Sequence, residues 1–172
     1  MSENPASGSA PATLAFDERG FRDALGGFAS GITIITTHDG EGPVGVTCQS
    51  FFSVSVDPPL VAFSLGRGSR SLAALRASGE VAVNFLSDAQ EHLSAQFARS
   101  GADKWQGVTW HPAEVNGAPT LDGVPGWVAG RIEQEIEAGD HLIFLVRVQE
   151  LHTDTARDPL LYSRGRYRRL AP

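Results

Sequence analysis

Residues 32–37 read Ile-Thr-Ile-Ile-Thr-Thr, and the chain resumes an extended pattern at Val44-Gly45-Val46-Thr47. The first run is almost entirely β-branched, and such side chains favour strands. Between the two runs, residues 39–43 have the composition of a tight turn. The pair therefore predicts a β-hairpin.

Extended patterns continue outward from this hairpin. Further strands are expected at residues 53–56, 60–65, 81–86, 127–137, 141–151, 160–162 and 166–170. In residues 127–137 charged positions alternate with apolar ones, as in a strand with one face in water. Asp57-Pro58-Pro59 separates the runs at 53–56 and 60–65 and predicts a corner, because proline cannot donate to a strand ladder.

Helical patterns are few and short. Phe21, Leu25 and Phe28 stand at helical spacing within residues 16–29, and a second helix is expected at 71–77. Ser87 and Gln90 match a capping box that opens a third helix, which ends near residue 99. Residues 101–126 predict a long ordered excursion pinned by three apolar anchors, Trp105, Val108 and Trp110. Many strands with two or three short helices favour a mainly β fold, a barrel rather than a βαβ sheet.

Composition indicates one folded domain. At 172 residues the chain suits a single core, which we place at 15–172, after a disordered tail at 1–14 that is rich in Ser, Ala, Pro and Gly. The net charge of -6 argues against nucleic acid as a partner. The one cysteine excludes an internal disulfide, and no apolar run reaches the roughly 18 residues that span a bilayer. We therefore expect a soluble cytoplasmic protein with no membrane partner.

Several catalytic motifs are absent or out of context. Residues 40–45 match G-x-G-x-x-G, but they join two strands, whereas the dinucleotide fingerprint opens a helix. The sequence has no G-x-S-x-G elbow and no histidine or cysteine spacing typical of zinc, so we expect no metal. Cys48 has no base nearby in sequence, which favours a packed side chain over a nucleophile.

Three segments carry side chains suited to binding a ligand. Thr47-Cys48-Gln49-Ser50-Phe51-Phe52-Ser53 gathers small donors at a strand end. Gly66-Arg67-Gly68-Ser69-Arg70-Ser71 leads from a strand into a helix, where a phosphate could meet hydroxyl, backbone and guanidinium donors; the alternative is a surface loop with an ordinary N-cap. Gly139-Asp140-His141 presents an imidazole at the start of a strand, where it could serve as a hydrogen-bond donor, acceptor or proton carrier. The alternative is a turn followed by a histidine without a functional role.

Together these segments resemble the flavin reductase-like family of FMN-binding split barrels, the reductase components of two-component flavin monooxygenases. The resemblance runs from Phe21 to about Tyr167 and includes the stretches 28–31, 53–60, 83–86, 97–98 and 105–108. It implies a Greek-key-like split β-barrel that forms a homodimer, uses FMN or FAD with NADH or NADPH, and serves a separate monooxygenase.

The resemblance also implies roles for individual residues. Thr47, Cys48, Gln49, Ser50 and Phe51 would line the flavin ring and ribityl chain, Ser64, Ser69, Arg70 and Ser71 would hold its phosphate, Phe97 and Lys104 would lie near the ring or nucleotide entry, and Tyr167 would approach from the closing strand. His141 would be the catalytic residue, orienting the nicotinamide.

The implied activity is NAD(P)H-dependent flavin reduction, a hydride passing from nicotinamide C4 to flavin N5. Three alternatives remain open: a bound flavin that acts on another small molecule, a non-enzymatic flavin-binding or sensor barrel, and a pyridoxamine-phosphate oxidase-like barrel using the arginines at 164, 166, 168 and 169. The sequence does not choose between FMN and FAD, or between NADH and NADPH.

Overall fold

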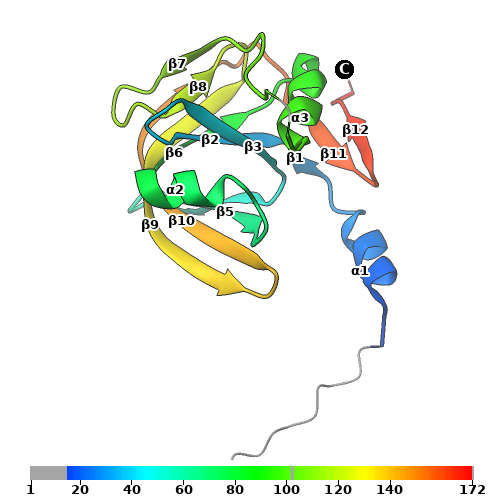
Figure 1. Cartoon of the computed structure of the whole chain (residues 1–172). Coiled ribbons are helices and arrows are strands. Elements are labelled where there is room, and N and C mark those ends of the chain that lie inside the picture. Colours follow the sequence, from blue (N-terminus) through cyan, green and yellow to red (C-terminus); the bar gives the residue numbers. More distant parts are fainter. Residues whose placement is uncertain (1–14, 102, 172) are drawn as a thin grey trace, which may run out of the picture.

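The computed structural model describes residues 15–101 and 103–171 (Figure 1). The tail expected at 1–14 lies outside the described residues. The elements are α1 (Glu18–Leu25), β1 (Ser30–Gly31), β2 (Thr33–His38), β3 (Pro43–Cys48), β4 (Phe51–Ser55), β5 (Leu60–Gly66), α2 (Leu72–Ser78), β6 (Glu80–Phe85), the 3-10 turn η1 (Asp88–Gln90), α3 (Glu91–Ala98), β7 (Trp110–Pro112), β8 (Pro119–Leu121), β9 (Gly126–Ala138), β10 (His141–Thr153), β11 (Leu161–Ser163) and β12 (Arg166–Arg168). The mainly β fold with short helices is confirmed.

One antiparallel sheet forms the body of the molecule. Its strand order is β3-β2-β6-β9-β10-β5-β4, so β3 and β4 lie at opposite edges. Only Gln49 and Ser50 separate these two strands in the chain. The three steps from Cys48 to Phe51 span at most about 11 Å, so the edges must come together and the sheet curls round on itself. The result is the split barrel seen in Figure 1.

The long β9–β10 hairpin places the His141 segment. β10 pairs with β9 on one side and with β5 on the other, in a register that sets His141 opposite Gly66. The hairpin turns at Gly139, whose φ of +63° is a conformation that glycine adopts without strain. The start of β10 and the loop that follows β5 are therefore neighbours in space.

Two large apolar clusters make up most of the core, beside a small third one of alanines between β6, β9 and the 101–126 excursion. The first fills the barrel with alternate residues of its strands, including stacked Phe63 and Phe144, whose ring centroids are 5.1 Å apart. The second lies between the other face of β2 and β3 and the helix α3, centred on Phe97. Trp105, Val108 and Trp110 pack against this second cluster, which confirms them as anchors of the excursion.

Three local features differ from the sequence prediction. The helix expected at 16–29 is shorter, because the chain leaves the helix at Gly26, and none of its residues is buried. The excursion at 101–126 contains a two-stranded sheet, β7 with β8, which we did not anticipate. A two-residue strand that the sequence did not predict, β1, pairs with β11 outside the barrel sheet.

Within the described residues, we find no helix long and apolar enough to span a membrane.

Candidate functional site

A cavity of about 770 Å³ opens where three segments meet. The segments are β3 from Pro43 to Val46, the loop between β5 and α2, and the chain at the end of α3. Four of the residues expected to bind the cofactor line this cavity: Ser69, Arg70, Ser71 and Lys104. The phosphate-binding loop inferred from sequence and the lysine implied by the family resemblance thus belong to one concave site.

The cavity carries positive charge. Lys104 donates from Nζ to the Gly45 carbonyl at 3.1 Å, and burial, followed by the nearby charge of Arg70, lowers the pKa of Lys104. No ion pair within the described part of the chain involves either cation. Asp103 also lines the cavity, but its Oδ1 accepts a hydrogen bond from the Trp105 amide at 3.0 Å. Two neighbouring cations without a carboxylate partner suit an anionic ligand.

Gly45 lets the cavity wall pack closely against Phe97. Gly45 lies on that wall, and a Cβ there would come within 2.5 Å of the Phe97 ring. Phe97 is fully buried and meets Trp105 edge-on at a centroid distance of 5.0 Å. Phe97 therefore supports the wall from behind and presents no free ring surface.

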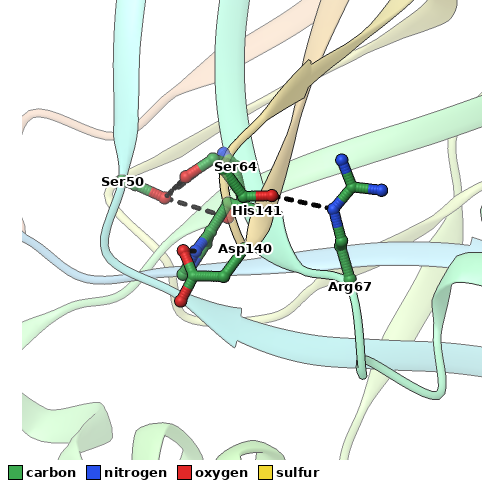
Figure 2. Close-up of polar contacts among 6 residues, drawn as sticks. Ser50, Ser64, Arg67, Asp140 and His141 are labelled. Atoms are coloured by element: carbon green, nitrogen blue, oxygen red, sulfur yellow. Dashed lines mark hydrogen bonds and ion pairs between the residues drawn. The ribbon is translucent and has the colours of Figure 1, made fainter. Parts of the chain in front are cut away.

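His141 stands beside this cavity at the start of β10. Its Nε2 lies 3.9 Å from the position a Cβ would take on Gly66, a residue of the cavity wall. Its Nδ1 lies 2.8 Å from Oδ1 of Asp140 (Figure 2). This contact lowers the pKa of the Asp140 carboxyl, which keeps the carboxylate ionised and favours the proton on Nδ1. The Nε2 atom of the half-exposed ring remains for a ligand.

Ser50 and Ser64 form a hydroxyl pair close to His141 (Figure 2). Their Oγ atoms are 2.7 Å apart, and the Ser50 hydroxyl donates to the Ser64 carbonyl at 2.9 Å. The Ser64 hydroxyl must then donate to Ser50, so both hydroxyl protons are used within the pair. The pair joins the residue before β4 to β5, and because Ser50 Oγ also accepts from the Ser64 amide at 3.2 Å, neither hydroxyl has a proton left to donate to a ligand.

The other expected site residues lie in packed positions, except Gln49. Thr47 donates to the Ser94 carbonyl at 2.7 Å, and the Tyr167 hydroxyl bonds Ser94 Oγ at 2.9 Å, so both hold α3. Cys48 is buried in the barrel, where burial raises the pKa of its thiol. Phe51 packs on Phe85, and Gln49 is exposed. The structure thus gathers four predicted residues in the cavity and places His141 beside it, with Ser50 and Ser64 near His141. It leaves Gln49 exposed and uses Thr47, Cys48, Phe51, Phe97 and Tyr167 in packing.

Sequence reasoning missed part of the wall. Pro43 to Val46 of β3 line the cavity together with Asp103 and Trp105. The available signal was Gly45 inside a strand pattern, since such a glycine often marks a place where a ligand or another part of the chain comes close to the strand. Arg67, which we considered for the anion, is absent from the wall and reaches the β9–β10 turn instead. Across the described residues, no three His, Cys, Asp or Glu side chains are grouped to hold a metal ion.

Comparison with known proteins identifies the family of this chain. The family model described as "Flavin reductase like domain" matches residues 25–171. The chain belongs to the flavin reductase-like family. The resemblance inferred from the sequence is thereby confirmed over nearly the whole described chain.

Members of the flavin reductase-like family match this chain closely. The reductase subunit HsaB of a flavin-dependent monooxygenase from Mycobacterium tuberculosis is 39% identical over 158 residues, covering 91% of this chain and 84% of that protein. An NADH:FMN oxidoreductase of Rhodococcus qingshengii is 36% identical, covering 88% and 81%. The structure of the Streptomyces globisporus NADH:FAD oxidoreductase SgcE6 with NAD and FAD fragments gives a TM-score of 0.86 at 36% identity, covering 91% and 94%.

Proposed function

We propose that this protein is an NAD(P)H:flavin oxidoreductase that passes a hydride from NADH or NADPH to FMN or FAD and supplies reduced flavin to a separate monooxygenase. The observation that carries the proposal is the cavity in which Arg70 and Lys104 stand without a carboxylate partner, with His141 at its edge. Relatives named as reductase subunits and as NADH:FMN or NADH:FAD oxidoreductases support it.

The residues present fit a flavin nucleotide. Ser69, Ser71, Arg70 and Lys104 offer two hydroxyls and two cations for its phosphate. Ser71 occupies the N-cap position of α2 but makes no capping hydrogen bond with its side chain, so its hydroxyl is available. When bound, the flavin supplies a ring that accepts a hydride at N5.

The protein's own contribution is binding and orientation. His141 offers Nε2 to the nicotinamide side, and Asp140 fixes which ring nitrogen carries the proton. Hydride transfer needs no protein acid or base, so we assign His141 to orientation. Replacing it should raise KM for the nicotinamide nucleotide more than it lowers kcat.

We further propose that the protein is a homodimer. The helix α1 has eight residues and buries none of them, although Phe21 and Leu25 are apolar. An isolated helix of this length is marginal in water, so its apolar face needs a covering surface. The edge strand β4 also exposes apolar residues, Phe52 and Val54. A second copy of this chain would cover both surfaces.

The decisive experiment is oxidation of NADH and NADPH by the purified protein with FMN, FAD, riboflavin or no flavin, followed at the nicotinamide absorbance. We expect turnover that rises and saturates with added flavin. Arg70→Ala should raise KM for FMN about tenfold or more while changing KM for riboflavin little, because riboflavin has no phosphate to lose a charge-assisted contact. Flavin binding without oxidation of either nucleotide would contradict the reductase function and favour the sensor alternative.

A further inference from the structure

Arg67 lies in the phosphate-binding loop, but its side chain is used elsewhere. It is the first residue after β5, and it makes two contacts with the β9–β10 turn and one with Glu137 of β9. The backbone N–H donates to the Asp140 carbonyl at 3.0 Å, Nε donates to the Gly139 carbonyl at 2.9 Å, and the guanidinium lies 3.2 Å from Glu137. Figure 2 shows the Arg67 side chain directed at this turn.

These contacts fall on the residues that present His141. The β9–β10 ladder ends at the pair Ala138 and His141, so Gly139 and Asp140 are outside it. Asp140 is 94% exposed at its side chain, and its backbone carbonyl is bonded by the amide of Arg67. Asp140 in turn holds the imidazole of His141. A guanidinium donor to a carbonyl is a stronger, more directional contact than a neutral one.

We propose that Arg67 is a positioning residue that fixes the Gly139-Asp140-His141 turn against the phosphate-binding loop, so that His141 is pre-set for the nicotinamide nucleotide. The Arg67 side chain acts through the Gly139 carbonyl, and so on the backbone of the adjacent Asp140 and His141, and it leaves the flavin phosphate to Arg70 and Lys104. This inference rests on the proposed reductase function.

Arg67 as a positioning residue, called the clamp below, and Arg67 as a phosphate ligand predict different results. As a clamp, Arg67→Ala should raise KM for NADH by about tenfold at saturating FMN, because small displacements of a positioning group are costly. The ratio of the FMN affinity to the riboflavin affinity of Arg67→Ala should equal that of the wild type. As a phosphate ligand, Arg67 would instead hold FMN, and Arg67→Ala would weaken FMN binding while sparing riboflavin.

Arg67→Lys sharpens the distinction. Lysine keeps the charge but has no N–H donor at the Nε position, from which Arg67 reaches the Gly139 carbonyl. The clamp therefore predicts that Arg67→Lys resembles Arg67→Ala in KM for NADH. A phosphate contact predicts that lysine restores FMN affinity.

Two matched control variants distinguish an effect on the position of His141 from a general loss of protein stability. Arg76→Ala removes another exposed arginine–glutamate pair, with Glu135 of β9, without touching the turn. Glu137→Gln removes the ion pair of Arg67 but leaves both carbonyl contacts. Exposed pairs of this kind contribute little, so both controls should keep wild-type KM for NADH.

A readout without turnover completes the test. NMR of ¹⁵N-labelled histidine in the flavin-free protein reports the tautomer of each of the five histidines, and His141→Gln identifies the signal of interest. We expect the His141 signal of the wild type to show a proton held on Nδ1, and Arg67→Ala to average it between tautomers while Arg76→Ala does not.

Unchanged KM for NADH together with an unchanged His141 signal in folded Arg67→Ala would overturn the proposal, as would selective loss of FMN affinity. If the wild-type protein oxidises neither nucleotide, the proposed function fails, and the histidine spectra alone still decide whether Arg67 sets the turn.

Discussion

Lys104 shows how one residue couples protonation to ligand binding. Burial and Arg70 lower its pKa from the usual value near 10.5. Lysine is charged below its pKa, so this side chain loses its charge at a lower pH than an exposed lysine does. The charged form is the one that attracts a phosphate. FMN affinity should therefore begin to fall at a pH below 10.5.

The measurement is the dissociation constant of FMN from flavin fluorescence, taken at increasing pH, with riboflavin as control for titration of the flavin ring. Riboflavin affinity should lack the Lys104-dependent step. Lys104→Arg should move the step to higher pH, because a guanidinium stays charged. If FMN and riboflavin weaken in parallel in the wild type, Lys104 makes no phosphate contact.

At the residue scale, the sequence identified parts of the site for different reasons. Ser69, Arg70 and Ser71 were accessible to physical reasoning, because a strand, a Gly/Ser loop and a helix in succession define an anion cradle. Lys104 came only from the family resemblance, since nothing in its neighbours predicts that it reaches back to Gly45. A sequence segment also does not say which residue faces inward. Cys48 is buried while Gln49 beside it is exposed.

At the element scale, the β9–β10 pairing depends on Gly130. The register between these strands shifts twice, and next to one shift a Cβ on Gly130 would lie 1.9 Å from the Arg147 carbonyl oxygen. A backbone atom cannot move aside as a side chain does. Gly130→Ala should therefore destabilise the protein by about 3 kcal/mol, the upper end of the usual cost of overpacking, measured by denaturant unfolding.

Gly31→Ala is the matched control for this prediction. Gly31 also lies in a strand, and no atom stands within 4 Å of a Cβ placed there. The substitution should change stability by less than about 1 kcal/mol. Equal stability of the two alanine variants would mean that the hairpin accommodates a side chain at Gly130 by shifting its backbone.

Element prediction succeeded where the pattern was long. The alternation in residues 127–137 predicted a strand that the structure extends by one residue at each end, Gly126–Ala138. The irregular register of that strand was not visible, because a bulge changes pairing without changing composition. β7 and β8 were missed because three residues are too few to show a period.

At the scale of the whole molecule, exposed apolar side chains gather on and just after two elements, the helix α1 and the edge strand β4. Phe28 is 79% exposed after α1, and Val56 is 93% exposed after β4. An uncovered edge strand with apolar side chains is a template for association, and proteins seldom leave large apolar patches in water. This distribution is the physical argument for the proposed homodimer.

The dimer predicts a matched pair of outcomes in light scattering coupled to size-exclusion chromatography. The wild type should have twice the mass of the 18.3 kDa chain. Val54→Asp, on the exposed face of β4, should shift the protein to monomer, because a charge buried at an interface without a partner is costly. Val115→Asp, at similar exposure between β7 and β8, should leave the dimer intact. A monomeric wild type would overturn the dimer and require that α1 is covered in some other way.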